Sequence, residues 1–358
     1  MTPSKFSFFV HFRKSIRTDI GLLWKPLGKL PENFYKKVFK TFLKTSYTWA
    51  QIMPTSKDQK KTKPIGTVEV VPMSAPMMLT ENREAFLAKM EHYLDNLVAK
   101  DVKIAGLGAL TSPLTAGGLS LKHRTDIALT NGNAFTAVII AEGLKKIVSE
   151  LSLNQPKIAI VGATGSVGSC VTKLLAREGF NDLLLVSQTM PKLQKLSESL
   201  QEYSVNATLS TDLKTLITAD ILIVLTASDS TLIHSEHLKH GSIILDGTQP
   251  RNTAKSLLSE RPDITLIDGG LVHINSIKLM GGSIGLSKGI YFACFSETFL
   301  LALEHYSKHF CLGNATLEQA DFIAGIAAKY KKFGFTLAPF SAFGQPVILK
   351  KGLLKTAA

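Results

Sequence analysis

The chain of 358 residues exceeds the size at which single hydrophobic cores usually stop growing, so we expect two domains and an appendage. Its 45% apolar composition is ordinary for a globular protein, and no apolar run reaches the roughly 18 residues that a membrane-spanning helix needs. The three cysteines are too few and too far apart for a disulfide framework or a zinc site, which predicts a reducing, cytoplasmic compartment and no metal centre.

The net charge of +13 is concentrated in the first part of the chain. Residues 1–64 hold 14 Lys/Arg and 3 Asp/Glu, whereas the remaining residues hold 27 and 25. The early run FSFFVHF is short, meets Arg13 and Lys14 at once and lacks a small-residue cleavage site, so we expect no secretory signal. The sequence therefore predicts a basic N-terminal extension on a nearly neutral body, with residues 56–64 (SKDQKKTKP) as a charged linker.

Apolar residues at helical spacing predict two amphipathic helices in this extension. The first stripe consists of Phe9, Phe12, Ile16, Ile20 and Leu23, and the second of Tyr35, Val38, Phe39 and Phe42, with Trp24 and Trp49 near the helix ends. Such helices are typical of attachment to an anionic membrane surface through residues 1–50, but two helices packed on the body explain the pattern equally well. The acid-poor composition leaves an organellar transit peptide as a third interpretation, and no nucleic-acid-binding motif accompanies the charge.

The body begins with strands and helices in alternation. In chain order we expect a strand at 67–71, a helix at 81–99, a strand at the start of 103–118 and a helix within 129–147. Asn131, Asn133 and Thr136 stand in the polar turn before the last of these helices. They either cap that helix or present amide and hydroxyl groups to a substrate.

The stretch KIAIVGATGSVGSCVTKLLAREG, which starts at residue 157, has the pattern of a dinucleotide-binding turn. A buried-type strand leads into Gly162, Gly165 and Gly168, which allow a tight turn, approach of the pyrophosphate, and close packing of helix on strand. The amino end of the following helix offers free N–H groups to the phosphates. We expect Cys170, inside this helix, to be buried filling. The residues expected to bind the cofactor here are Gly162, Thr164, Gly165, Ser166 and Val167.

The end of the next strand, DLLLVSQ at 182–188, indicates which nicotinamide cofactor binds. NAD sites usually have an acidic residue there, which hydrogen-bonds the ribose hydroxyls. This chain has Ser187, Gln188 and Thr189, followed by Lys192, so no carboxylate would repel a 2′-phosphate. The pattern favours NADPH over NADH.

Three further apolar strands end in small or polar residues, where a doubly wound sheet places its binding crevice. They are expected within 219–230, 241–252 and 263–275. We expect the nicotinamide ribose to lie near Thr226, Ala227 and Ser228. Asp246 and Asp268 end the other two strands, either as turn formers or as substrate-binding residues.

These elements predict an α/β fold: a Rossmann-type doubly wound parallel sheet with a second, smaller α/β domain and a basic helical N-terminal extension. The expected parts are the extension over 1–64, the first part of a substrate domain over 65–150, the dinucleotide-binding domain over 151–285, and a helical segment over 286–358 that completes the active site.

Several motifs, in this order, resemble those of the cyanobacterial long-chain acyl-(acyl carrier protein) reductases. The similar stretches are GALTS, TNGNAFTA, VGATGSVGS, LDGTQPRN, IDGGLVH and FACFSET, within roughly residues 70–340. The chain departs from the family's pattern at Gln188, where the family has arginine, at Phe135, where it has histidine, and at Thr248-Gln249, where it has Gly-Tyr. The basic extension is not part of the pattern.

The resemblance implies that an acyl group passes from acyl carrier protein or coenzyme A to Cys294, and that NADPH then reduces the thioester to a fatty aldehyde. Spacing alone favours a structural Cys294, because free cysteines are usually buried and a helix starting near Ser287 would place it two turns from the helix dipole's positive end. Phe292, Phe295 and Phe299 at helical spacing form either core or the wall of an acyl tunnel.

Two other functions remain open on the residues alone. One is an NAD(P)-dependent dehydrogenase of a small hydroxy or amino acid, with shikimate-dehydrogenase-like architecture, in which Cys294 is packing. The other is a non-catalytic nucleotide-binding protein at a membrane surface. All three predict a cytoplasmic protein, with or without peripheral membrane attachment, and none involves nucleic acid.

Overall fold

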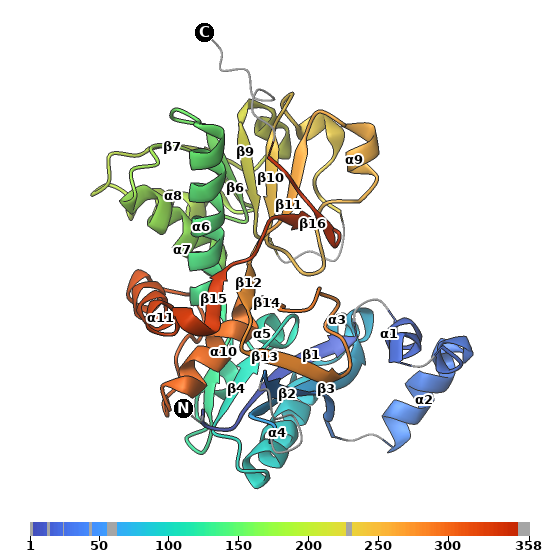
Figure 1. Cartoon of the computed structure of the whole chain (residues 1–358). Coiled ribbons are helices and arrows are strands. Elements are labelled where there is room, and N and C mark those ends of the chain that lie inside the picture. Colours follow the sequence, from blue (N-terminus) through green and yellow to red (C-terminus); the bar gives the residue numbers. More distant parts are fainter. Residues whose placement is uncertain are drawn as a thin grey trace. The chain divides into compact units, whose positions relative to one another are not determined.

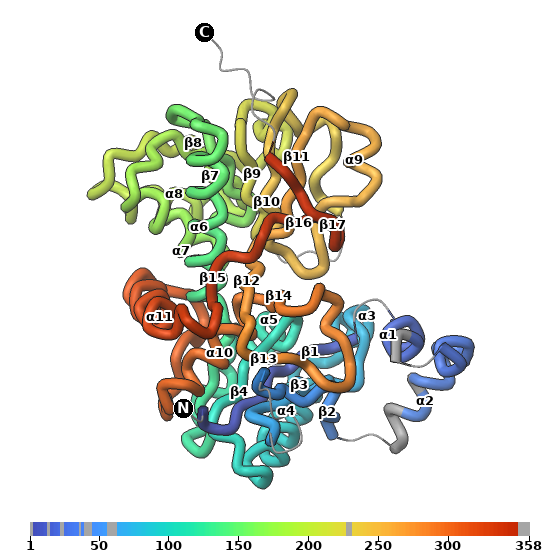
Figure 2. Tube along the Cα trace, in the orientation of Figure 1, coloured from blue at the N-terminus to red at the C-terminus, as the bar shows by residue number. Residues whose placement is uncertain are grey.

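The computed structural model describes residues 3–12, 15–23, 25–42, 45–55, 63–226 and 231–349, and it divides into two compact units (Figures 1 and 2). Unit 1 comprises residues 1–132, 273–313 and 322–336, and unit 2 comprises residues 133–272, 314–321 and 337–358. The expected boundaries at residues 64, 150 and 285 therefore do not separate the compact parts. Unit 1 is also the larger of the two, whereas the second domain was expected to be the smaller.

In the described part of unit 1, six strands form a mixed sheet in the order β13-β2-β3-β1-β4-β5. The strands are β1 (Phe6–Phe12), β2 (Tyr47–Pro54), β3 (Gly66–Ser74), β4 (Ile104–Leu107), β5 (Ala128–Thr130) and β13 (Ile277–Gly281). Strands β3, β1, β4 and β5 are parallel, and β2 runs antiparallel to both of its neighbours. The strand expected at 67–71 is confirmed as part of β3.

The stretch FSFFVHF forms the central strand β1, so the helix predicted from Phe9 onward is wrong for residues 9–12. Alternate side chains of β1 pack into different cores. The ring centroids of Phe8 and Phe295 lie 5.6 Å apart, and those of Phe9 and Tyr93 lie 6.5 Å apart. A strand that is buried on both faces has a continuous run of apolar residues. Some residues of such a run also fall at the spacing of a helix face, so the pattern does not distinguish strand from helix.

The two helices that follow are present, at α1 (Ile16–Leu23) and α2 (Glu32–Phe42). They form a helical lobe, residues 16–42, that projects beside the sheet of unit 1 (Figure 1). Ile16 and Tyr35 are buried in a small core with Phe12 of β1. The extension is therefore part of unit 1. Trp49 lies in β2 and not at a helix end, and Trp24 is outside the described residues.

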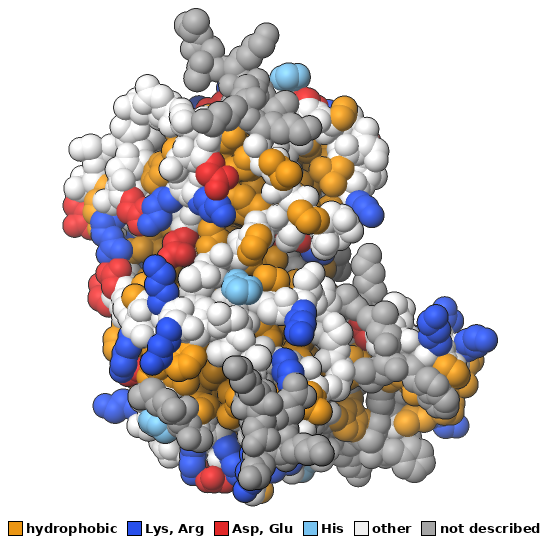
Figure 3. Space-filling view, viewed as in Figure 1, with side chains coloured by type: hydrophobic (Ala, Val, Ile, Leu, Met, Phe, Trp, Pro, Cys, Tyr) orange, Lys and Arg blue, Asp and Glu red, His pale blue; other side chains and the backbone are white. Residues whose placement is uncertain are grey.

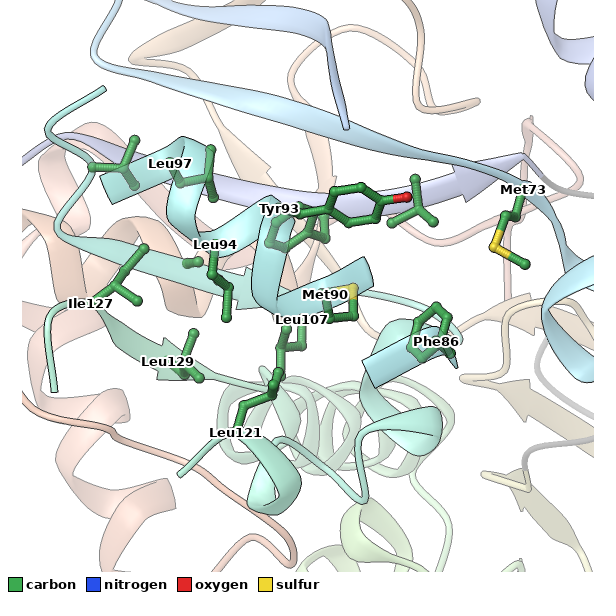
Figure 4. Close-up of a cluster of buried hydrophobic side chains, with 14 of the residues drawn as sticks. Met73, Phe86, Met90, Tyr93, Leu94, Leu97, Leu107, Leu121, Ile127 and Leu129 are labelled. Carbon is green, nitrogen blue, oxygen red and sulfur yellow. The ribbon is translucent and has the colours of Figure 1, made fainter. Parts of the chain in front are cut away.

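One face of the unit 1 sheet is covered by α4 (Arg83–Ala99), which confirms the helix expected at 81–99. Asn82 caps this helix by accepting hydrogen bonds from the backbone N–H groups of Glu84 (2.9 Å) and Ala85 (3.1 Å). The core beneath it is shown in Figure 4 and contains Met73, Phe86, Met90, Tyr93, Leu94, Leu97, Leu107, Leu121, Ile127 and Leu129. The opposite face receives α10 (Ala293–Leu303), whose Phe295 contacts Phe8.

The described strands of unit 2 form a parallel sheet in the order β11-β10-β9-β6-β7-β8. They are β6 (Ile158–Val161), β7 (Asp182–Val186), β8 (Asn206–Ser210), β9 (Ile221–Val224), β10 (Ile243–Asp246) and β11 (Thr265–Asp268). Numbered from the first strand of the unit, this order is the 3-2-1-4-5-6 arrangement of the Rossmann fold. The predicted doubly wound sheet is confirmed. Its helices include α6 (Asn133–Leu151), α7 (Ser166–Arg177) and α8 (Met190–Glu198).

The segment 286–358, expected to be helical, also contains short strands. The segment contributes β14 and β15 to a sheet in the order β14-β12-β15, and it also forms the hairpin β16-β17. The remaining elements are α3 (Ala75–Thr80), α5 (Thr111–Leu114), α9 (Leu257–Glu260), α11 (Leu317–Lys329), β12 (Leu271–Ile274), β14 (Ile290–Phe292), β15 (Gly334–Leu337), β16 (Ser341–Ala342) and β17 (Gln345–Pro346). Short 3-10 turns lie at Leu27–Lys29, Leu119–Leu121, Leu213–Thr218, Ser235–His237 and Lys331–Phe333. Within the described ranges, every helix is too short or too polar to cross a bilayer.

The central position of β1 generates a stability prediction. Phe6 is fully buried and its ring stacks on that of Phe299 at 5.2 Å, whereas Phe34 of the lobe is 49% exposed. We expect Phe6→Ala to lower the free energy of unfolding by about 3–5 kcal/mol, because it removes a core ring and leaves a cavity. The matched change Phe34→Ala should cost about 0.5 kcal/mol. Urea-induced unfolding measures both, and equal losses would contradict the central placement of β1.

Candidate active site

Cys294 lies in the first turn of α10, which begins at Ala293 directly after β14. The expected helix start near Ser287 is therefore wrong, and Cys294 is not two turns inside the helix. The first turn of a helix has backbone N–H groups without an intrahelical acceptor and the positive end of the helix dipole. Both effects favour a thiolate over a thiol.

Burial opposes these effects. Desolvation raises the pKa of the Cys294 thiol to about 12, although the N–H of Phe295 lowers it, and the negative charge of Glu297 raises it further. The residue nevertheless keeps part of its surface accessible, in contrast to Cys170 and Cys311, which are buried. Cys294 is therefore a half-buried residue whose raised pKa favours the protonated thiol at neutral pH.

The turn after β5 lies directly against Cys294. Gly132 has a φ of +78°, and a Cβ added to it would lie 2.2 Å from the Cys294 Cβ, so only glycine fits. The preceding Asn131 holds this turn in place: its side-chain amide donates to the carbonyl oxygens of Gly117 (3.1 Å) and Gly313 (2.9 Å). Asn131 thus binds backbone carbonyl groups of unit 1.

Glu297 and Thr130 are further polar residues near Cys294 that our sequence analysis did not single out. Both are fully buried, and the Thr130 hydroxyl donates a hydrogen bond to Glu297 Oε1, which joins β5 to α10. Two signals in the sequence could have revealed them. Glu297 follows Cys294 at helical spacing, and Thr130 opens the TNGN turn.

Aromatic rings support the start of α10. Phe295 is 1% exposed and contacts the rings of Phe8 and Tyr291, with ring centroids 5.6 and 5.3 Å apart. Phe299 is also buried and stacks on Phe6. These two rings are core residues of unit 1, whereas Phe292 remains half-buried. The core interpretation therefore holds for two of the three phenylalanines.

In unit 2, the glycine turn has the predicted geometry. Gly162 has a φ of +83°, and a Cβ there would lie 2.9 Å from the backbone nitrogen of Thr226. A Cβ on Gly168 would lie 2.1 Å from the carbonyl oxygen of Gly162, which explains the close packing of α7 on β6. A Cβ on Gly165 would lie 3.2 Å from the same carbonyl oxygen of Gly162. The helix α7 begins at Ser166 without a side-chain cap, so the turn fits a dinucleotide phosphate.

Polar side chains join this turn to its neighbours. The Ser166 hydroxyl accepts hydrogen bonds from Asn133 Nδ2 (2.9 Å) and from the backbone N–H of Ala315 (3.0 Å). The hydroxyl groups of Thr164 and Ser187 lie 2.5 Å apart, which ties the turn to the end of β7. The structure thus brings together Asn133, Ser166, Thr164 and Ser187 in unit 2.

The other expected cofactor residues occupy varied environments. Gln188, Thr189 and Lys192 are exposed, and Val167 and Thr226 are half-buried. Ala227 and Ser228 are outside the described residues. Thr136, on α6, lies near Gly270, whose added Cβ would be 3.6 Å from the Thr136 methyl group.

The two carboxylates at the ends of β10 and β11 both accept hydrogen bonds, Asp246 within its own loop and Asp268 from more distant segments. Asp246 is 2% exposed and accepts four hydrogen bonds, from the backbone and hydroxyl groups of Thr248 and Thr253, at 2.5–3.1 Å. Burial raises its pKa. Asp268 forms a bidentate ion pair with Arg251 at 2.7 and 2.8 Å. The contacts of Asp246 favour the turn-forming alternative for that residue, whereas Asp268 binds Arg251 and the backbone N–H of Phe343.

Cys294 and the glycine turn belong to different units, each with its own part of the candidate chemistry. Unit 1 contains the half-buried Cys294 with Glu297 and Thr130, and unit 2 contains the glycine turn, which is the candidate phosphate-binding site. Among the described residues, no group of three or more His, Cys, Asp or Glu is arranged to hold a metal ion.

Comparison with known proteins places these features in context. Residues 140–268 match the family model described as shikimate/quinate 5-dehydrogenase. The chain is 29% identical over 287 residues to aminotransferase PigE of Serratia sp.; the match covers 79% of this chain and 33% of that protein. The chain thus spans about a third of the length of that relative.

Two further proteins are similar. The long-chain acyl-[acyl-carrier-protein] reductase of Synechococcus elongatus is 26% identical over 273 residues, which are 71% of this chain and 78% of that one. The solved iminosuccinate reductase of Paracoccus denitrificans, in complex with NAD+, is 21% identical over 34% of this chain and 38% of its own, with a TM-score of 0.28.

Proposed function

We propose that this protein reduces a long-chain acyl thioester to a fatty aldehyde, with NADPH as the hydride donor and Cys294 as the acyl-accepting nucleophile. The observation on which this rests is the half-buried Cys294 in the first turn of α10, in a chain that also has a glycine turn of the dinucleotide-binding pattern. The similarity to the Synechococcus reductase supports the choice of an acyl substrate. The acyl donor is acyl carrier protein or acyl-coenzyme A.

The residues of each unit have distinct tasks in this proposal. Cys294 Sγ attacks the thioester carbonyl and the carrier thiol leaves, so that the acyl group is held on the enzyme. The first-turn N–H groups of α10 favour the negative charge that develops there. In unit 2, Gly162, Gly165 and Ser166 would hold the pyrophosphate of the cofactor, with Thr164 tied to Ser187 beside it. When bound, the cofactor supplies the hydride that reduces the acyl carbon, and the aldehyde departs as the Cys294 thiol is restored.

One alternative function has an observation in its favour. The match of residues 140–268 to the shikimate/quinate 5-dehydrogenase model is also compatible with a dehydrogenase of small hydroxy acids. Cys294 would then have no chemical role. Oxidation of a small hydroxy acid by the protein, with no aldehyde formed from an acyl thioester, would identify this activity.

The acyl-cysteine step is tested by substitution. Incubation of the intact protein with an acyl thioester, without cofactor, should add one acyl group on Cys294, as read by peptide mass spectrometry. Cys294→Ser should remove this adduct and nearly abolish aldehyde production, because a hydroxyl is far harder to deprotonate than a thiol. Cofactor affinity should stay unchanged. A folded Cys294→Ser protein that makes aldehyde at the original rate would refute the mechanism.

The cofactor preference is tested at Lys192, which is exposed in the first turn of α8. We expect NADPH to bind more tightly than NADH, and Lys192→Glu to weaken NADPH binding about tenfold, or about 1.4 kcal/mol, with little effect on NADH. Lys255→Glu makes the same charge change at another exposed position of unit 2 and should have no effect. Fluorescence titration measures these affinities. Equal binding of both cofactors to the unaltered protein would contradict the preference.

We also propose that the helical lobe binds an anionic membrane surface. Its exposed charged side chains among the described residues are all cationic: Arg17, Lys25, Lys29 and Lys37. The two acidic side chains of the lobe are directed inward, since Asp19 is buried and Glu32 accepts hydrogen bonds from the first N–H groups of α1. Basic and apolar side chains gather on this projection (Figure 3). Coulomb attraction and the exposed ring of Phe34 then act together.

The lobe must be tested by charge reversal, because deletion of residues 1–60 would remove β1 and β2. Changing Lys25, Lys29 and Lys37 to Glu should abolish sedimentation with phosphatidylserine vesicles, which should itself weaken as salt rises. The control changes Lys195, Lys214 and Lys255 to Glu in unit 2. Equal loss of vesicle binding in both variants would contradict a specific membrane surface. Loss of acyl transfer from carrier protein, without any vesicle binding by the unaltered chain, would assign the lobe to a protein partner instead.

A further inference from the structure

Glu297 is a buried acidic residue that the acyl-transfer scheme above does not use. It follows Cys294 by three residues on α10, so both side chains lie on one face of the helix, about 5–6 Å apart at their Cβ atoms. Its side chain has no solvent exposure. A carboxylate is expensive to bury, and its place one turn from the candidate nucleophile therefore calls for an explanation.

Contacts on two sides fix Glu297 relative to Cys294. Thr130, at the end of β5, donates a hydrogen bond from its hydroxyl to Glu297 Oε1. Two residues later, Gly132 lies so close to Cys294 that a Cβ would approach the cysteine's Cα and Cβ to 2.3 and 2.2 Å. The same short segment therefore holds both the carboxylate and the cysteine. Thr298, the next residue on α10, anchors this turn of the helix by donating to the carbonyl oxygen of Cys294 at 3.3 Å.

The chemistry of Cys294 requires a proton acceptor. Burial raises the pKa of the thiol to about 12, and the charge of Glu297, one helical turn away, raises it further. A thiol of this kind must lose its proton as it attacks, because its thiolate is too scarce at neutral pH. The negative charge of Glu297 disfavours a thiolate at Cys294. This repulsion disappears when the Glu297 carboxylate takes the proton of the thiol, because the carboxyl group is then neutral.

We propose that Glu297 accepts the proton of the Cys294 thiol during acyl transfer, and that Thr130 is the positioning residue that orients its carboxylate. This inference rests on the proposed role of Cys294 as nucleophile. As the bond between Cys294 Sγ and the acyl carbon forms, the proton moves from sulfur to the Glu297 carboxylate. The bond between the acyl carbon and the carrier sulfur breaks, and Glu297 returns the proton to the departing thiolate. No group is oxidised or reduced in this step.

The test compares acyl transfer with alkylation of the same thiol. Single-turnover acylation of Cys294, without cofactor, requires proton transfer to Glu297, whereas alkylation by iodoacetamide at pH 9 uses thiolate formed by exchange with solvent. Glu297→Gln should slow acylation about a hundredfold. It should speed alkylation, because the loss of a nearby negative charge lowers the pKa of the thiol. Glu304→Gln, at the C-cap of α10, is the matched control and should change neither rate, because this half-buried carboxylate pairs with Lys329 at the other end of the helix from Cys294.

Thr130 provides a second pair of variants in case Glu297→Gln does not fold. Thr130→Val removes the hydroxyl that orients the carboxylate and should slow acylation, and Thr130→Ser retains a hydroxyl and should restore it. An original acylation rate in Glu297→Gln or in Thr130→Val would overturn the inference. A parallel fall of acylation and alkylation would also overturn it, because it would indicate a structural role. No acyl adduct on the unaltered protein would refute the proposed function and this inference together.

Discussion

The close approach of α10 to the sheet of unit 1 is the constraint on which the candidate active site depends. The helix lies almost on the strand backbone: a Cβ on Gly106 of β4 would come within 2.1 Å of Thr298 Oγ1. Phe8 fills the remaining space beside it, because the same Cβ would lie 2.5 Å from its ring. A larger residue at position 106 would lift the helix, and with it Cys294, away from the turn at Gly132.

The packing of α10 has two opposed effects on the ionisation of the Cys294 thiol. The first turn of α10 favours a thiolate at Cys294, while burial favours the neutral thiol, and burial dominates. A neutral thiol reacts slowly with oxidants and with stray electrophiles, since the thiolate is the nucleophilic form. A neutral thiol of this kind becomes a nucleophile when a neighbouring group takes its proton, and Glu297 is a buried carboxylate one helical turn away.

The parts of the structure that could be predicted from the sequence are those set by local patterns. The Rossmann sheet follows from short apolar strands in alternation with helices, and the turn at Gly162 from glycine spacing. The central strand β1 was missed, because its pairing with β3 and β4 joins residues 6–12 to residues 60 and 100 positions later, and no local period encodes that. The start of α10 was misplaced because residues 287–292, where a helix start was considered, form a turn and the strand β14.

The roles of the candidate site residues also differ in whether the sequence alone could define them. Asp246 had two interpretations because a carboxylate at a strand end serves a turn or a ligand, and only the four hydrogen bonds around it favour the turn. The contact of Gly132 with Cys294 joins segments more than 160 positions apart, so the sequence alone could not pair them. By contrast, Glu297 stood one helical turn from Cys294 in the sequence itself.

The edge strand β13 has a consequence for how the chain folds as it is made. β13 pairs with β2, but residues 133–272 of unit 2 are synthesised between the two. The strands of the Rossmann sheet are contiguous within that stretch, so unit 2 can begin to fold while the sheet of unit 1 is still incomplete. During that interval β2 is an open edge, with backbone groups that can pair with another chain. Long-range closure of this kind is slow, so the nascent protein is most vulnerable to aggregation at β2 until residue 281 has emerged from the ribosome.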